Sequence, residues 1–431
     1  MIRTQHLELK PLQQRPIAVD LFAGAGGMTL GFEQAGFDVL AAVEIDPIHC
    51  AVHEYNFPFC SVLCKSVENT TGNEIRDRSN IGNREIDVVI CGSPCQGFSL
   101  MGKRIFDDPR NSLVFHFHRL VLELQPKFFV MENVRGITIG EHKQILKALI
   151  YEFKINGYQV EENYQILNAA YYGVPQARER LFLIGARKDM GLPKYPQPIT
   201  KPVNYHKLKA KHLSHLPVCP TVWEAIGDLP EVEQYTDLLT KDWTIADYSK
   251  PSNYAAILRN IKTVADDYSY DRLFDSRLLS SSLRTKHSQA TIERFAATVP
   301  GEREPISRFH KLHPAGVCNT LRAGTDKYKG SFTSPRPIHP YTPRCITVRE
   351  AARLHSYPDW FRFHITKWHG FRQVGNSVPP LLAKAVAAEI ICTLNISPTK
   401  PNISYELGTE KLLQLNISQA VQKYECVDYV L

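Results

Sequence analysis

The feature that most constrains the fold of this chain is an alternation of short apolar segments with helical patterns between residues 16 and 187. Helical apolar spacing, proline at a first turn and glycine at an end mark the intervening helices. Repeated strand–helix units form a mostly parallel sheet with helices on both faces. The sequence therefore predicts an α/β, doubly wound, Rossmann-like domain. The predicted strands are 17–22, 38–46, 86–91, 127–133 and 180–187.

The alternation stops near residue 189, and six prolines fall within 193–220. Polar and basic sequence then continues to about residue 345 without strand–helix rhythm, which predicts a smaller, separate inserted domain. After it, Thr347 and Glu350 have the spacing of a capping box at the start of a helix. A last helix is predicted within 378–391, with two prolines in its first turn.

A glycine-rich turn, AGAGG, follows the first strand. It is not a complete dinucleotide fingerprint, because Thr29 stands where the third glycine would be. The second strand leads to Glu44, 20 residues after Gly24, where a carboxylate can accept hydrogen bonds from ribose hydroxyls. An adenosine ligand without a pyrophosphate, such as S-adenosylmethionine, fits this pattern. A tight turn beside a solvated acid is the alternative.

Cys95 lies in the segment CGSPCQGFS, which follows the apolar run 86–91. A C-x-x-x-C spacing occurs at 60–64 and 91–95, but the flanking residues are apolar, so we predict no metal site. A redox pair would normally have C-x-x-C spacing. A nucleophile fits better, because open α/β sheets bind ligands beyond the carboxyl ends of their strands. The basic pair 103–104 favours the thiolate.

Two further motifs carry charged residues to strand ends. Glu132, in MENV, ends the predicted strand 127–133, where a partly desolvated carboxyl can act as an acid. In QARER, Gln176, Arg178 and Arg180 precede the next strand. Alternate residues of an extended segment project to the same side, so both arginines are expected to face the site. An ion-pair network is the alternative.

The net charge is +7, from 51 basic and 44 acidic residues. Basic residues gather at 201–216 and 303–344, which suggests a phosphate-facing surface, with a solvated basic face as the alternative. Ten scattered cysteines, no long apolar run and no secretory signal predict a cytoplasmic protein without a membrane partner. The second stretch contains Arg303, Arg308, Lys311, Arg322, Lys327, Lys329, Arg336 and Arg344.

Taken together, seven ordered motifs resemble those of the DNA (cytosine-5)-methyltransferases of bacterial modification systems. The match covers about 16–390. It implies an N-terminal arm (1–15), a catalytic domain (16–188), a target-recognition domain (189–345), a C-terminal segment that packs back on the catalytic domain (346–395), and a tail of unknown role (396–431). The motifs are DLFAGAGG, EID, SPCQGFS, MENV, QARER, RCITVREAARLHSYPDWF and RQVGNSVPP.

The resemblance implies a mechanism that these residue types can support. The Cys95 thiolate attacks carbon 6 of a cytosine flipped out of duplex DNA, and carbon 5 takes a methyl group from S-adenosylmethionine. Glu132 hydrogen-bonds ring nitrogen 3, and Arg180 with Arg178 holds the carbonyl oxygen. The cofactor-binding residues implied are Phe22, Gly24, Gly26, Glu44, Asp46, Pro94, Asn376 and Ser377. The substrate-binding residues implied are Gln96, Ser99, Thr320 and Arg322.

One position departs from the family pattern. Ser66, in LCKSVEN, stands where the family usually has an aspartate that binds the adenine amine. The polar stretch 68–85 that follows is predicted to be a loop.

Three alternatives stay open at this point. A tRNA cytosine-5 methyltransferase would use the same chemistry, although the large basic insert favours duplex DNA. A Rossmann oxidoreductase with a reactive cysteine is disfavoured by the missing third glycine. A catalytically silent DNA-binding homologue is disfavoured by the intact Cys95, Glu132 and Arg180. The expected partner is double-stranded DNA, a separately encoded restriction endonuclease is a further candidate, and we expect a monomer.

Overall fold

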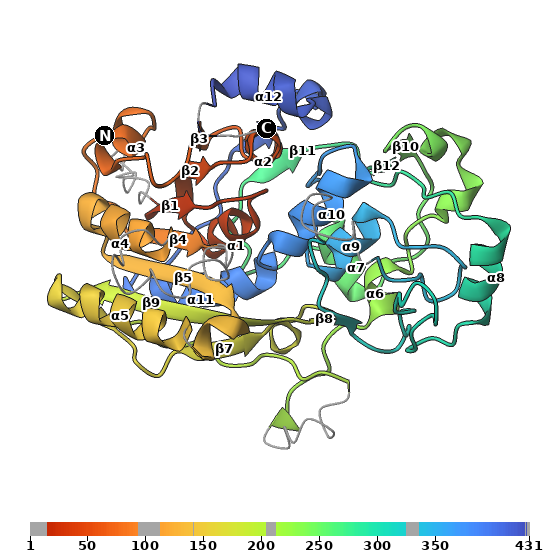
Figure 1. Ribbon diagram of the computed structural model, residues 1–431, viewed down its shortest axis with the longest axis horizontal. Helices are drawn as coiled ribbons and strands as arrows, with labels where there is room; N and C mark the ends of the chain where they lie inside the picture. The colour runs from red at the N-terminus through yellow and green to blue at the C-terminus, as the bar shows by residue number, and fades with distance from the viewer. Residues whose placement is uncertain are drawn as a thin grey trace, which may run out of the picture.

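The computed structural model describes residues 15–93, 113–140, 142–203, 213–324, 336–426 and 428. Its centre is an eight-stranded sheet in the order β3-β2-β1-β4-β5-β9-β6, with β7 also paired to β9 (Figure 1). The strands from β3 to β5 are parallel, whereas β9 runs antiparallel to β5, β6 and β7. The bounds are β1 Ile17–Leu21, β2 Asp38–Glu44, β3 Ser61–Cys64, β4 Val88–Gly92, β5 Phe128–Val134, β6 Tyr158–Val160, β7 Gln165–Asn168 and β9 Glu179–Arg187.

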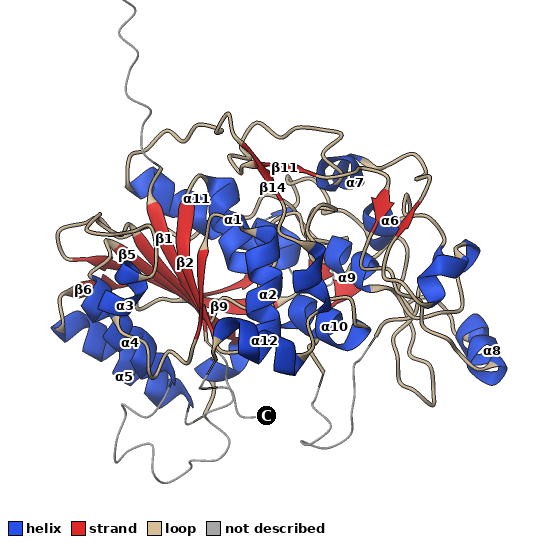
Figure 2. Ribbon diagram, turned by 90° about the horizontal axis from the view of Figure 1, so that it is seen from above, coloured by secondary structure: helices blue, strands red, loops and turns tan. Residues whose placement is uncertain are grey.

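Helices cover both faces of this sheet, which confirms the predicted doubly wound, mostly parallel architecture (Figure 2). Side chains of α4 and α5 share one apolar cluster with Val19 and Leu21 of β1. Side chains of α1, α2 and α11 share another with Ala18, because successive side chains of a strand point to opposite faces. These helices are α1 Gly27–Ala35, α2 Pro47–Asn56, α4 Leu113–Leu124, α5 His142–Ile155 and α11 Pro380–Thr393.

Two glycines allow α11 to lie directly against α1, although the two helices are far apart in the sequence. A Cβ added at Gly31 would lie 2.4 Å from the Ala383 Cβ and 2.5 Å from the Pro380 carbonyl oxygen. At Gly27 it would lie 2.4 Å from the Val378 oxygen. No side chain fits in these gaps, so the close approach depends on glycine. The contact brings residues near 377 beside the glycine-rich turn that precedes α1.

A second lobe lies on the right of Figure 1 and is built from short elements with small apolar clusters. It contains α6 (Val222–Ile226), α8 (Gln289–Ala297) and the pair β10 (Thr244–Ile245) and β12 (Leu278–Leu279). Nearby, β13 (Cys318–Asn319) pairs in parallel with β8 (Gln176–Ala177).

Part of the predicted insert 189–345 packs on the first domain instead of the second lobe. Arg272 forms a fully buried ion pair with Glu33 of α1, at 2.9 Å between Nη2 and Oε2. The strand that holds Arg272, β11 (Asp271–Leu273), pairs with β14 (Ser404–Glu406) of the tail. The insert is therefore anchored to the sheet side of the molecule through a buried charge pair.

The segment after the insert forms α9 (Val348–Leu354) and α10 (Lys367–Asn376). The expected capping box is present, with the Thr347 hydroxyl and the Glu350 carboxylate each accepting a backbone N–H of the other residue. The tail adds β14, the 3-10 helix η9 (Glu410–Gln414) and α12 (Ile417–Tyr424). No helix within the described ranges is long and apolar enough to cross a membrane.

The prediction of a loop over 68–85 is wrong for its middle part, which forms the helix α3 (Gly72–Asp77). The Thr71 hydroxyl caps it by accepting the Glu74 N–H, and the Gly72 N–H donates to the Glu123 carboxylate. Six residues are too few to show a 3.6-residue apolar period, and Glu123 belongs to another helix. The sequence pattern therefore could not reveal this element.

Candidate active site

The carboxyl ends of β1, β2, β4 and β5 meet along one edge of the sheet. Leu21 pairs with Cys91, Cys91 pairs with Met131, and Gly92 pairs with Glu132. The glycine-rich turn, which follows β1, and Glu132, near the carboxyl end of β5, therefore lie at this edge on either side of β4. Ser93 is the last residue described after β4, and it accepts hydrogen bonds from the Asn133 amide. Four predicted site residues lie outside the described ranges: Pro94, Cys95, Gln96 and Ser99.

Glu44 joins the glycine-rich turn to the start of α2. Its Oε2 accepts the Gly24 N–H at 2.8 Å, and its Oε1 accepts the Asp46 N–H at 2.9 Å. Each carboxylate oxygen retains a lone pair for a ligand hydroxyl. A Cβ added at Gly24 would meet no atom within 4 Å, so there is open space at this turn. The geometry fits a ribose-bearing ligand that approaches the backbone closely.

The turn itself has an unusual backbone that glycine makes possible. Gly24 and Gly26 have φ values of +55° and +97°, and Phe22 also has a positive φ of +59°. At Gly26 a Cβ would lie 2.4 Å from the Phe57 ring, so any larger residue would clash. Of these three predicted cofactor residues, Gly26 thus serves the shape of the turn, and Phe22 and Gly24 border its open side.

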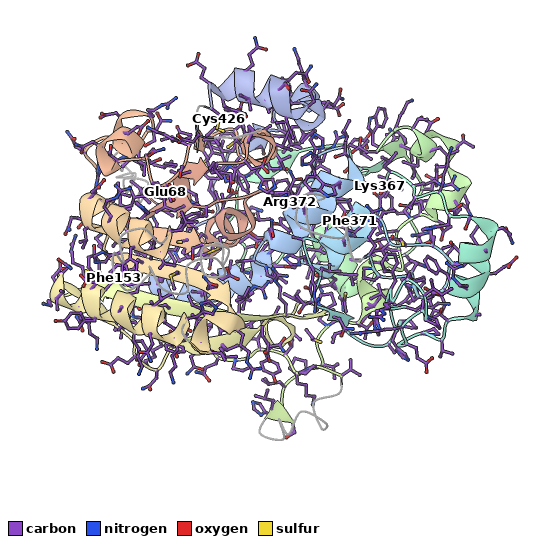
Figure 3. All side chains as sticks on the ribbon, in the orientation of Figure 1. Glu68, Phe153, Lys367, Phe371, Arg372 and Cys426 are labelled. Atoms are coloured by element: carbon purple, nitrogen blue, oxygen red, sulfur yellow. The ribbon has the colours of Figure 1, made fainter. Side chains whose placement is uncertain are left out.

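Asp46 caps the N-terminus of α2, with its Oδ1 accepting the N–H groups of Ile48 and His49. Burial alone would raise the pKa of Asp46, but His49, Arg372 and His369 outweigh burial and keep this pKa below its usual value. Asp46 therefore stays charged at neutral pH. Arg372 comes from α10, which lies between the sheet and the second lobe (Figure 3).

The residue at the place of the third glycine, Thr29, has a structural partner that the sequence pattern did not reveal. Its hydroxyl donates to Asp20 Oδ2 at 2.7 Å and lies 3.0 Å from His53 Nε2. Burial raises the pKa of Asp20 to about 7 and lowers that of His53 to about 3. All three side chains are buried, with Asp20 in β1, Thr29 in α1 and His53 in α2. The hydrogen-bonded side chains of Asp20, Thr29 and His53 thus take the place of the close packing that a third glycine would allow.

Glu132 and Arg180 form the charged pair of the site. Arg180 Nε lies 2.7 Å from Glu132 Oε1, and Glu132 is only 6% exposed. Burial raises the pKa of Glu132, and the positive charges of Arg180 and Arg178 offset part of that rise. The carboxyl is therefore easier to protonate than an exposed glutamate. The structure brings together two of the predicted catalytic residues in an arrangement suited to an acid.

Arg178 takes a different direction from Arg180, contrary to the expectation that both face the same side. Its guanidinium is fully buried and donates to the carbonyl oxygens of Leu321 (2.9 Å), Gly375 (2.9 Å) and Ser377 (2.8 Å). The reason is that residue 177 belongs to β8 and residue 179 begins β9, so the two arginines do not continue one strand. Arg178 ties the insert and the C-terminal segment to the sheet.

A buried polar network surrounds Arg178 and includes a histidine that sequence reasoning missed. His355 Nε2 lies 3.0 Å from the Ser377 carbonyl oxygen, and its Nδ1 lies 2.9 Å from Gln176 Nε2. Burial lowers the pKa of His355 well below its usual value, so this imidazole stays neutral. Gln176 also accepts the Leu321 N–H through Oε1. The signal available was the position of His355 inside a family-like motif.

The predicted cofactor residues Asn376 and Ser377 lie at the end of α10. Asn376 is the last residue of the helix and is exposed, and the Ser377 hydroxyl donates to Val374 O. Ser377 lies against Gly27, where an added Cβ would come 2.9 Å from the Ser377 Cβ. Both residues are thus held near the glycine-rich turn.

Thr320 and Arg322 lie on the insert side of the same region. The Thr320 hydroxyl donates to the Ala177 carbonyl oxygen at 2.7 Å, and Arg322 is exposed. Their backbone abuts α10, because a Cβ added at Gly375 would lie 2.4 Å from the Ala323 nitrogen. Residues 322–323 of the predicted insert therefore lie against α10.

Beside Thr320 lies a cavity of about 220 Å³ with a strongly basic lining and no acidic residue. Arg308 has a φ of +59°, in the left-handed region that non-glycine residues seldom adopt. Three of the lining arginines are exposed. The basic lining residues are Arg303, Arg308, His310, Arg322 and Arg336.

Two basic residues of the same stretch do not face this cavity, so the expectation of one shared phosphate-facing surface is wrong for them. Arg344 is buried and paired with Glu231 and Glu350, both at 2.8 Å. Lys311 is buried and donates to the Phe295 carbonyl oxygen. Buried contacts with distant residues take both side chains away from solvent. Within the described ranges, no group of three histidine, cysteine or acidic residues is arranged to hold a metal ion.

The chain is similar to known proteins over most of its length. The model of the C-5 cytosine-specific DNA methylase family matches residues 18–392. The type II methyltransferase M.XorII of Xanthomonas oryzae pv. oryzae is 55% identical over 410 residues, which are 95% of this chain and 92% of that protein. M1.HphI of Haemophilus parahaemolyticus is 35% identical, with 86% of each chain covered.

Solved structures agree with this match. A prophage-encoded DNA modification methyltransferase of E. coli superposes with a TM-score of 0.70 and 33% identity, over 88% of this chain and all of that one. The Dnmt2 methyltransferase of S. pombe is 15% identical with a TM-score of 0.52, over 89% of this chain and all of that one, so it supports the fold alone.

The fold and the sequence matches define the class first: the protein is a methyltransferase with a Rossmann-like catalytic sheet. More specifically, the chain belongs to the C-5 cytosine-specific DNA methylases and is a DNA (cytosine-5)-methyltransferase of the type II restriction-modification kind. This assignment confirms the resemblance seen in the motifs. It also excludes the alternative hypothesis of a Rossmann oxidoreductase with a reactive cysteine.

Proposed function

We propose that this enzyme transfers a methyl group from S-adenosylmethionine to carbon 5 of a cytosine flipped out of a specific double-stranded DNA sequence, through a covalent adduct with Cys95. The observation that carries the proposal is the buried Glu132–Arg180 pair, at the strand edge from which the segment of Cys95 continues. The Glu132 carboxyl and the Arg180 guanidinium are in contact at this edge, and the segment that follows β4 in the sequence supplies the Cys95 thiol.

In this mechanism the Cys95 thiolate forms a bond to carbon 6, which makes carbon 5 nucleophilic. Protonated Glu132 hydrogen-bonds ring nitrogen 3, so negative charge does not accumulate on the ring. Arg180 orients Glu132 and places positive charge beside the base carbonyl. Once carbon 5 has taken the methyl group, as the S–CH3 bond of the sulfonium breaks, the carbon-5 proton would pass to solvent and the C6–S bond would break, which returns the Cys95 thiolate and restores the aromatic ring. Arg178 acts at a distance, by lowering the pKa of Glu132 and by holding the segments around the site.

The residues at the glycine-rich turn fit S-adenosylmethionine. Glu44 has free lone pairs for the ribose hydroxyls, the turn is open at Gly24, and Asp46 is a charged carboxylate. When bound, the cofactor supplies an electrophilic methyl group on a sulfonium. Phe22, Asn376 and Ser377 border the same turn and are proposed to complete the pocket. Gly26 shapes it, and Pro94 belongs to the same proposed set.

We infer that the DNA lies across the insert and the strand edge together. The arginine-lined cavity beside Thr320 suits a backbone phosphate, because arginine side chains neutralise and hydrogen-bond DNA phosphates. Gln96 and Ser99 are proposed to contact the substrate near Cys95, and Thr320 and Arg322 to contact it from residues 189–345, the proposed target-recognition domain. A cytoplasmic monomer that acts beside a separately encoded endonuclease is part of the same proposal.

The test uses duplex DNA that carries 5-fluorocytosine, because fluorine cannot leave as the carbon-5 proton does. Bisulfite sequencing of host DNA after expression first identifies the target sequence. With cofactor, the wild-type enzyme is then expected to form a stable adduct that mass spectrometry maps to Cys95. Cys95→Ala should form none while it still binds cofactor. Cys392→Ala, at an exposed cysteine of α11, is the matched control. Methyl transfer by Cys95→Ala would refute the proposal.

A further inference from the structure

The tail (396–431) lies beyond the family match, which ends at residue 392, and it packs on α2. The Tyr424 hydroxyl donates to Glu54 at 2.5 Å, and Lys423 pairs with the same carboxylate at 3.1 Å. The Gly408 N–H donates to the Tyr55 carbonyl oxygen, and Leu413 is fully buried. Figures 1 and 2 show α12 lying over α2. The tail is thus a docked part of the first domain.

The far end of the tail reaches the loops that follow β2 and β3. The Cys426 thiol lies 3.7 Å from the carbonyl oxygen of Ile45, the residue between Glu44 and Asp46. Asp428 Oδ2 accepts the Ser66 N–H at 2.9 Å, and its Oδ1 accepts the Asn69 amide at 2.8 Å. Figure 3 shows Cys426 beneath α12, at the end of the tail.

These two loops border the same part of the strand edge. Glu44 lies opposite Cys64 in the β2–β3 pairing, and the Lys65 N–H donates to the Glu44 carbonyl oxygen. The 65–69 loop therefore begins directly beside Glu44, on the β3 side. One short stretch of the tail contacts both loops.

We propose that the tail is part of the cofactor site: Cys426 lies against the 44–46 loop, and Asp428 is a positioning residue that holds the 65–69 loop ready for the nucleoside half of the cofactor. This rests on the proposed function. A carboxylate that binds one main-chain and one side-chain donor restricts the 65–69 loop, and a restricted loop loses less entropy when a ligand binds. Because coupling between two binding events is reciprocal, bound cofactor stabilises the docked tail by the same factor.

The experiment measures the Kd of S-adenosylhomocysteine by calorimetry, together with steady-state kinetics. In Asp428→Ala we expect the Kd and the KM for S-adenosylmethionine to rise about five- to twentyfold, in the range of a charge-assisted hydrogen bond. The kcat at saturating cofactor, the KM for DNA and the Tm should stay at wild-type values. Glu425→Gln, at an exposed carboxylate three residues earlier, should behave as wild type.

A second variant tests the same contact from the side of the 65–69 loop. Asn69→Ala removes one donor to Asp428, so the affinity losses of Asn69→Ala and Asp428→Ala should be less than additive in the double variant. Hydrogen exchange of the 417–428 peptide should slow when S-adenosylhomocysteine binds to the wild type, and not in Asp428→Ala. An unchanged Kd in Asp428→Ala overturns the inference, as does a parallel loss of Tm, kcat and DNA affinity. A wild-type enzyme that binds no cofactor would instead refute the proposed function.

Discussion

Replacing Glu132 with glutamine removes the acid of the proposed site while keeping its size and one hydrogen bond to Arg180. General acid catalysis typically contributes 10²- to 10⁴-fold in rate. At about 1.36 kcal/mol per factor of ten, this corresponds to roughly 2.7–5.5 kcal/mol of activation free energy. The contribution is expected to be substantial here, because Glu132 is buried and its Oε1 is 2.7 Å from Arg180 Nε.

The pH dependence follows from the raised pKa of Glu132. The protonated form is the active one, so the rate of the wild type should fall as pH rises through that pKa. Glu132→Gln should lose this limb of the profile. Folding stability should also fall as pH rises. Because the pKa of Glu132 is raised, the folded state releases this proton at a higher pH than the unfolded state does. Folding stability of the wild type therefore decreases above the ordinary glutamate pKa, and the variant avoids that decrease.

The assay is single-turnover methyl transfer at saturating DNA and cofactor, measured across pH. Glu179→Gln is the matched control, because Glu179 is an exposed neighbour that pairs with Arg135 and not with Arg180. It should retain a rate within about twofold of the wild type, as expected for a surface pair. A Glu132→Gln enzyme with the wild-type rate and the wild-type pH profile would refute the role of Glu132 as the acid.

Three further predictions concern packing, charge and DNA binding. Gly31→Ala should lower the free energy of unfolding by about 1–3 kcal/mol in denaturant titrations, because its Cβ would overlap α11; an unchanged midpoint would contradict the close packing. Glu33→Gln should cost about 3–5 kcal/mol by the same measurement, because it leaves Arg272 buried without its partner; a loss below 1 kcal/mol would count against this. Arg303→Gln should weaken DNA binding and reduce by about one the slope of the logarithm of the binding constant against the logarithm of the salt concentration. Arg277→Gln, at an arginine that already lies near Asp275, should leave both unchanged. Equal slopes for the two variants in anisotropy titrations would reject the phosphate assignment.

The sequence by itself determined five strands of the sheet, most of its helices and the position of several site residues along it, whereas β3, β6 and β7 were not predicted. Local apolar periodicity indicates strands and helices, and glycine and proline mark their ends. The glycine-rich turn was predicted because it directly follows a strand, and Glu44 and Glu132 because each lies at or near the carboxyl end of one. In a parallel sheet the carboxyl ends of strands necessarily meet, so chain order alone places such residues at one edge.

Only the tertiary structure decided what each polar side chain binds. Arg178 and Arg180 are two residues apart, yet one holds carbonyl oxygens of distant segments and the other holds Glu132. Arg303 lines a cavity, while Arg344, in the same basic stretch, is buried between two glutamates. Asp428 reaches Ser66 across more than 360 residues. Local sequence carries the preference of a residue for a backbone shape, but its partners come from packing between segments that have no fixed spacing in the chain.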